Sequence, residues 1–136
     1  MKKRILWIAV GVVLPVAFLV GFIWWQLPTV FLADVAPADV ARIEVFNGTD
    51  GKRFVIEDTA DIEYIVTNIQ RVKMYKEGWE IKDGFLYSLS FYAADGSRMA
   101  HLELNGEESI RDGNMEYECE YDVLCFGYIK DIEARQ

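Results

Sequence analysis

Hydrophobic residues fill the start of the chain without interruption. Residues 5–25 contain no charged side chain, and Lys2, Lys3 and Arg4 come directly before them. As a helix, this run would be about 31 Å long, which matches the hydrocarbon core of a bilayer at about 30 Å. The pattern therefore predicts a single transmembrane helix over residues 5–25.

Two interpretations of the apolar run remain open: a permanent anchor or a cleaved signal peptide. A signal peptide has an apolar centre of only about 7–15 residues, followed closely by small residues at the cleavage site. The nearest small-residue pattern, at residues 36–38, lies well beyond the run and contains a proline. We therefore expect the helix to stay in the lipid bilayer. Because the three basic residues precede it, the N-terminus is expected in the cytoplasm and the rest of the chain outside the cell membrane.

The residues that follow the anchor are ambiguous. Residues 26–38 contain two prolines but also apolar side chains, including Phe31 and Leu32. They form either a spacer at the membrane interface or the edge of a folded core. We divide the chain into a cytoplasmic tip and anchor (1–25), a spacer (26–38) and an extracytoplasmic domain (39–136).

The hydrophobic pattern of the domain first predicts a hairpin and a helix. Alternating apolar residues flank the turn-forming residues 47–51, as in a β-hairpin. Asp58 is a helix-capping residue type, and apolar residues then recur at three- and four-residue steps: Ile62, Ile65, Val66, Ile69 and Val72. This spacing predicts an amphipathic helix over residues 58–71.

Further along the chain, glycines that follow Asp or Asn divide runs of strand length. The four pairs are Asp83-Gly84, Asp95-Gly96, Asn105-Gly106 and Asp112-Gly113. They predict tight turns in an antiparallel meander of about five strands. Asp122 is the expected cap of a short terminal helix that places Cys125, Ile129 and Ile132 near one face. The resulting fold class is α+β, with the antiparallel meander packed on one amphipathic helix.

Charge limits the partners that the domain can bind. The whole chain has a net charge of −8, and from Pro37 onward 11 Lys and Arg oppose 21 Asp and Glu, a net charge of −10. This balance disfavours binding to nucleic acid or to anionic lipid headgroups.

Acidic and aromatic residues provide the candidate interaction surface. Glu116, Glu118 and Glu120 occupy every second position and would form an acidic ladder on one face of a strand. The ladder either keeps the domain soluble or attracts a cationic partner or loosely held calcium. The Asp-x-Asp-x-Asp-Gly loop of a calcium site is missing, so we expect no metal and no cofactor. Trp79 belongs to an aromatic part of the meander that either packs in the core or forms a contact patch.

Catalytic signatures are missing from the sequence. His101 is the only histidine, and its alternation with Leu102 and Leu104 places it toward solvent. The sequence contains no Gly-x-Ser-x-Gly turn, His-Glu-x-x-His helix or glycine-rich phosphate loop. We therefore expect no enzymatic activity.

The two cysteines, Cys119 and Cys125, leave two alternatives open. Disulfides persist outside the cytoplasm, and a turn near residues 121–122 could bring the two Cα atoms within bridging distance. The alternative is that both are small apolar residues of the core.

The sequence also resembles a group of proteins. "ARIEVFNGTDGKRFVIEDTADIEYIVTNI" and the later "YSLSFYAADG" resemble uncharacterised small exported domains of Gram-positive bacteria, which pair an N-terminal anchor with a compact α+β domain. The resemblance covers residues 41–132 and implies no catalytic residue. We expect a membrane-tethered, extracytoplasmic protein-interaction or accessory module with a protein partner in the cell envelope. The alternative is a sensor domain that binds small ligands or cell-wall fragments, and an enzyme is the least favoured.

Overall fold

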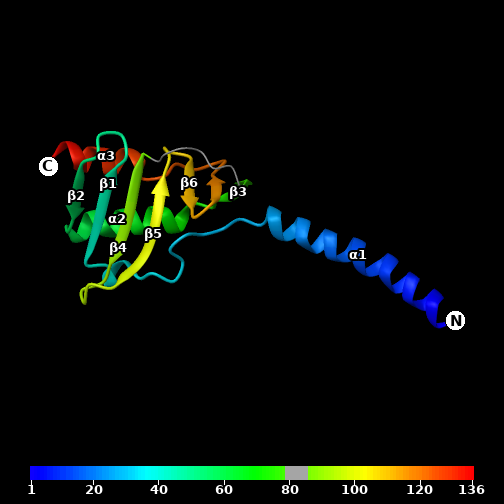
Figure 1. Ribbon diagram of the computed structural model, residues 1–136. Helices are drawn as coiled ribbons and strands as arrows, with labels where there is room; N and C mark the ends of the chain where they lie inside the picture. Colours follow the sequence, from blue (N-terminus) through cyan, green and yellow to red (C-terminus); the bar gives the residue numbers. More distant parts are fainter. Residues whose placement is uncertain (79–85) are drawn as a thin grey trace.

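A computed structural model describes residues 1–78 and 86–136 of the chain, and it has the expected α+β architecture (Figure 1). Helix α1 (Lys2–Gln26) projects from the folded domain, and none of its side chains is buried. Within the described residues, it is the one helix that is long and apolar enough to cross a membrane. The predicted N-terminal apolar helix is therefore present.

The domain is built on one antiparallel sheet of seven strands within the described residues, in the order β2-β1-β4-β5-β6-β7-β3. The strands are β1 (Arg42–Asn47), β2 (Arg53–Ile56), β3 (Tyr75–Gly78), β4 (Tyr87–Tyr92), β5 (Arg98–Leu104), β6 (Ser109–Asp112) and β7 (Met115–Glu118). β1 and β2 form the predicted hairpin, and β4 to β7 form a meander. β3 does not join this meander in sequence order, because it pairs with β7 at the far edge.

The amphipathic helix is confirmed as α2 (Thr59–Arg71). It begins where expected because the Asp58 carboxylate accepts a hydrogen bond from the backbone N–H of Asp61 at 3.0 Å, which satisfies a free donor of the first turn. Ile62, Ile65, Val66 and Ile69 are buried along one face. The three- and four-residue spacing thus identified the face that packs on the sheet.

Only one of the turns in the described part of the meander is a two-residue turn. Asp112 pairs with Met115, so Gly113 and Asn114 alone connect β6 to β7, and Gly113 has the left-handed φ of 62° that such a turn requires. The connections before and after β5 are longer. The Asp83-Gly84 pair lies outside the described residues.

The terminal helix, α3 (Phe126–Ala134), starts later than Asp122. Cys125 occupies the N-cap position, and the Asp122 carboxylate instead accepts a hydrogen bond from the N–H of Val123 at 2.8 Å. The predicted cap is therefore wrong, although Ile129 and Ile132 are buried as expected. Asp122 holds its own loop rather than the helix.

Both long helices of the domain cover the same face of the sheet (Figure 1). Their apolar residues form one buried cluster with the alternate positions of the central strands: Ile43, Val45, Tyr87, Leu89, Phe91, Leu102, Leu104 and Ile110. The prediction that Tyr87, Leu89 and Phe91 share a face is confirmed. Alternate residues of the same strands point away from both helices.

The segment after α1 belongs partly to the core. Phe31 and Leu32 are buried, and the ring of Phe31 meets that of Tyr117 edge-on at 4.9 Å between centroids. The amide of Gln70 on α2 donates to the carbonyls of Leu32 at 2.8 Å and Val35 at 2.6 Å. A short 3₁₀ turn, η1 (Pro37–Asp39), then leads into β1. Phe31 and Leu32 therefore belong to the edge of the folded core, which was one of the two alternatives for this segment.

Candidate functional site

We call the sheet face that points away from α2 and α3 the open face. Strand register arranges its side chains in rows that cross the sheet, because neighbouring strands place paired residues on the same side. One row contains Arg53, Phe46, Ser88, Glu103, Arg111 and Glu116. A second row contains Val55, Glu44, Ser90 and His101.

The open face is hollowed over β2, β1, β4 and β5. A depression of about 600 Å³ lies there. Its lining includes Tyr92 and side chains of both rows: Glu44, Phe46, Arg53, Val55, Ser88, Ser90 and His101. The lining combines aromatic rings, hydroxyls, an imidazole and charges of both signs. Such a mixture of apolar surface and convergent polar groups is typical of binding sites.

A cluster of three polar residues lies within the depression. Ser90 Oγ is 2.9 Å from His101 Nδ1, and Ser88 Oγ is 3.5 Å from His101 Nε2. His101 is exposed, as its alternation with leucines predicted. Hydroxyls and a neutral imidazole can each donate and accept hydrogen bonds, so this cluster can bind either kind of polar group.

Two arginines lie over aromatic rings beside this cluster. The guanidinium carbon of Arg42 is 4.3 Å from the centroid of the Tyr92 ring, and that of Arg53 is 4.9 Å from the centroid of the Phe46 ring. Arg42 Nε also lies 3.3 Å from Glu44 Oε1. Contacts of a cation with a ring face orient the guanidinium groups while leaving donors available for a partner.

Similarity to known proteins does not assign a role to this surface. No protein-family model, curated protein or solved structure matches the chain. The role of the open face is therefore inferred from its chemistry and from its position in the fold.

The acidic ladder expected on β7 does not form an exposed surface. Glu116 and Glu118 share the open face, but Glu116 is only 3% exposed and its carboxylate accepts a hydrogen bond from Ser109 Oγ at 2.9 Å. Glu118 is half-buried, and Glu120 is exposed but lies beyond the end of β7. The ladder fails because Glu116 is buried against its neighbours, including Ser109 of β6, and because Glu120 does not belong to the strand. Trp79, the fourth residue of the expected surface, lies outside the described residues.

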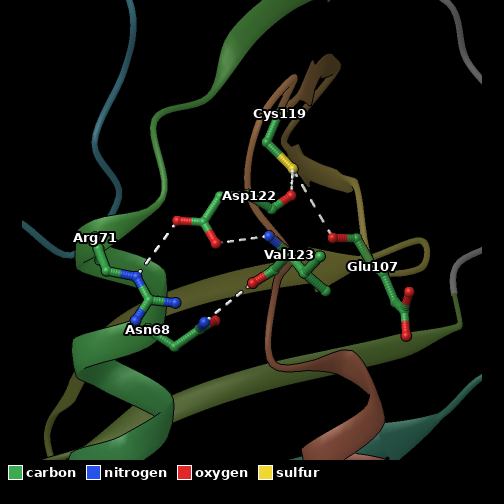
Figure 2. A network of polar contacts seen from close by, with 6 residues as sticks. All are labelled: Asn68, Arg71, Glu107, Cys119, Asp122 and Val123. Carbon is green, nitrogen blue, oxygen red and sulfur yellow. Dashed lines mark hydrogen bonds and ion pairs between the residues drawn. The ribbon is translucent and has the colours of Figure 1, made fainter.

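The two cysteines are free thiols, and both are buried. Cys119 Sγ donates to the carbonyl of Asp122 at 3.0 Å (Figure 2), and Cys125 is the N-cap residue of α3. Burial raises the pKa of the Cys125 thiol to about 12. The two cysteines therefore belong to the core and do not form a disulfide, because the Cys119 thiol points toward a backbone carbonyl of its own loop.

The loop that contains Cys119 and Asp122 is fixed to the end of α2. Asn68 Nδ2 donates to the carbonyl of Val123 at 3.1 Å, and Arg71 Nε lies 3.3 Å from Asp122 Oδ2 (Figure 2).

A second polar network fixes α3 to the sheet. The Glu133 carboxylate accepts hydrogen bonds from Tyr87 Oη at 2.5 Å and from Asn47 Nδ2 at 2.9 Å. Both networks join elements of the domain and support the fold.

Sequence reasoning missed the cluster of Ser88, Ser90 and His101 because each residue was judged alone. Alternation in "YSLSFY" and "RMAHLEL" places all three on polar faces of two strands joined by the turn at Asp95-Gly96. Pairing these strands through that turn would bring the serines close to the histidine. The register of this hairpin pairs Ser90 with His101, and alternation along either strand alone does not give that register.

Proposed function

We propose that this protein is a membrane-tethered, extracytoplasmic interaction module that binds a protein partner of the cell envelope through its open face and has no catalytic activity. The observation that carries this proposal is the asymmetry of the sheet. Both α2 and α3 cover one face, whereas the other presents a hollow with aromatic, hydroxyl and charged side chains. An N-terminal helix able to cross a membrane supplies the tether.

The chemistry of the depression favours binding over nucleophilic catalysis. A catalytic serine needs a base that a third group orients, commonly a carboxylate. Two carboxylates share the open face with His101, and both lie beside arginines: Glu103 Oε2 is 2.7 Å from Arg111 Nε, and Glu44 Oε1 is 3.3 Å from Arg42 Nε. The imidazole itself contacts serine hydroxyls at both ring nitrogens. This arrangement suits recognition of a polar surface.

Photo-cross-linking in intact cells tests the protein-binding proposal. A photoreactive amino acid at Val55 lies in the depression, and the same group at Tyr64 provides a matched control, because Tyr64 is also exposed but belongs to α2. We expect a defined adduct from position 55 and none from position 64. Equal labelling at both positions, or no adduct at 55 from a folded chain, contradicts the proposal.

The volume of the depression supports a second candidate function, a sensor of small ligands or cell-wall fragments. At about 600 Å³ it falls within the range of about 300–1,000 Å³ for ligand pockets. A ligand present at about 100 times its Kd stabilises a fold by about 2.7 kcal/mol. Thermal unfolding with soluble cell-wall fragments should show this gain in the parent chain and lose it in Ser90→Ala. A gain that persists in Ser90→Ala places the ligand elsewhere.

A further inference from the structure

The connection between α1 and the domain is short and is held by backbone hydrogen bonds. The N–H of Thr29 donates to the carbonyl of Met74 at 2.6 Å, and the N–H of Met74 donates back to the carbonyl of Thr29 at 2.9 Å. Since α1 ends at Gln26, only Leu27 and Pro28 separate the helix from this pair. Met74 is fully buried and immediately precedes β3, so the pair joins the helix directly to the core.

A side-chain contact extends this connection to β3. Lys76 Nζ lies 4.4 Å from the centroid of the Trp24 ring, in the last turn of α1. Tryptophans at the ends of membrane helices lie at the depth of the lipid headgroups. A lysine ammonium in contact with such a ring must lie at a similar depth. The contact therefore places β3 beside the headgroup layer whenever α1 spans a bilayer.

The surface around this connection has the chemistry that a headgroup layer requires. Leu27 and Val30 are apolar and 53% and 40% exposed, and Lys73 is an exposed cation next to Met74. Apolar side chains can enter the boundary between headgroups and acyl chains, while lysine ammonium groups reach lipid phosphates. β3 also contains the exposed Glu77, so Lys73, Lys76 and Glu77 together carry a net charge of +1, in contrast with the net charge of −10 from Pro37 onward.

We propose that the β3 edge of the sheet lies on the headgroup layer of the membrane that α1 crosses, with Lys73 and Lys76 near lipid phosphates. The inference rests on the proposed function only in requiring that α1 spans a bilayer. Figure 1 shows the sheet extending away from α1, with β3 nearest and β2 farthest. At about 4.8 Å per strand, β2 lies about 29 Å from β3. The depression near β2 is thus held away from the lipid surface at a fixed orientation.

Headgroup quenching measures this orientation. Two variants of the full chain, Glu77→Cys on β3 and Val55→Cys on β2, each carry a fluorophore on the introduced cysteine. Each variant is reconstituted into phosphatidylcholine vesicles with nitroxide-labelled headgroups. The parent chain measures any labelling of the buried Cys119 and Cys125. We expect severalfold stronger quenching at position 77 than at 55. Equal quenching at both positions overturns the inference.

Two sets of variants separate a docked domain from a freely moving one. A flexible Gly-Ser insertion after Gln26 should reduce quenching at position 77 to the level at 55. Lys76→Glu should also reduce it, whereas Lys52→Glu, the same charge change in the exposed β1–β2 connection, should not. Quenching at position 77 that none of these changes affects overturns the inference.

Vesicle flotation distinguishes failure of the anchor from failure of the orientation. A chain that does not float with the vesicles refutes the anchor itself. A chain that floats but shows equal quenching at positions 77 and 55 refutes only the orientation.

Discussion

Glu116 and Glu120 are chemically identical side chains in different surroundings. Glu116 is buried and accepts a hydrogen bond from Ser109, whereas Glu120 is exposed beyond the end of β7. We predict that Glu116→Ala lowers the free energy of unfolding by about 1–3 kcal/mol, because it leaves the buried Ser109 hydroxyl without this acceptor. Glu120→Ala should change it by less than about 0.5 kcal/mol. Urea denaturation of the solubilised full chain measures both values, and equal effects would contradict the burial of Glu116.

Tyr128 provides a prediction about pH. Its hydroxyl donates to Asp61 Oδ1 at 2.6 Å, and this hydrogen bond, together with partial burial, raises the pKa of Tyr128 to about 12. An unfolded tyrosine has a pKa of about 10. Because the native state holds the phenol proton more tightly, its stabilising contribution is complete below about pH 10 and is lost as the pH rises through about 12.

The Tyr128→Phe variant tests this linkage. Between about pH 9 and about pH 11.5 the free energy of unfolding should fall less steeply in the variant than in the parent chain. Tyr121→Phe is the control, since Tyr121 is 93% exposed. Burial and the Glu133 carboxylate also raise the pKa of Tyr87, so some pH dependence should remain in Tyr128→Phe. Identical slopes for all three chains would refute the role of the bond between Tyr128 and Asp61.

At the scale of elements, α2 contributes Ile62, Ile65, Val66 and Ile69 to the core that covers one face of the sheet. Ile65 is fully buried in the middle of α2 and belongs to the common core. We predict that Ile65→Ala lowers the free energy of unfolding by about 2–5 kcal/mol, since it removes buried methyl groups and leaves a cavity. Glu63→Ala, on the exposed side of the same helix, should cost less than about 0.5 kcal/mol. A small effect of Ile65→Ala in urea denaturation would contradict the packing of α2 on the sheet.

Local patterns predicted individual elements better than their arrangement. The α2 helix and the β1–β2 hairpin follow from residues close in sequence, so periodicity and turn residues were sufficient. The positions of β1 beside β4 and of β3 beside β7 depend on contacts between distant segments, which periodicity does not encode. The predicted cap of α3 was wrong because the helix begins four residues after Asp122, whose carboxylate contacts the N–H of Val123 and Arg71 of α2.

The candidate site was predictable only in part for the same reason. Alternation placed His101 toward solvent, but its contacts with Ser88 and Ser90 depend on the register between β4 and β5. The burial of Glu116 likewise depends on its neighbours across the sheet rather than on its own strand. A pattern along one strand indicates which side a residue faces, but its accessibility depends on the residues of adjacent strands.

At the scale of the whole molecule, a helix able to cross a membrane is joined to a sheet whose face away from α2 and α3 is hollowed over β2, β1, β4 and β5. Residues beyond α1 enter the core almost at once, since Phe31 is buried and Thr29 pairs with Met74. Cleavage close behind α1 would therefore free the domain from the membrane. It would also remove the contact between Trp24 of α1 and Lys76 of β3. The protein as proposed depends on retention of α1.

Proteolysis of intact cells that express the full chain tests this central claim most directly. Mass spectrometry of the membrane fraction before and after adding protease identifies the mature N-terminus and the protected fragment. We predict that the untreated chain retains Lys2–Gln26 and that protease removes the domain while leaving this helix in the membrane. A domain that resists added protease in intact cells but is digested after lysis, or a mature chain that begins after residue 25, would contradict the account.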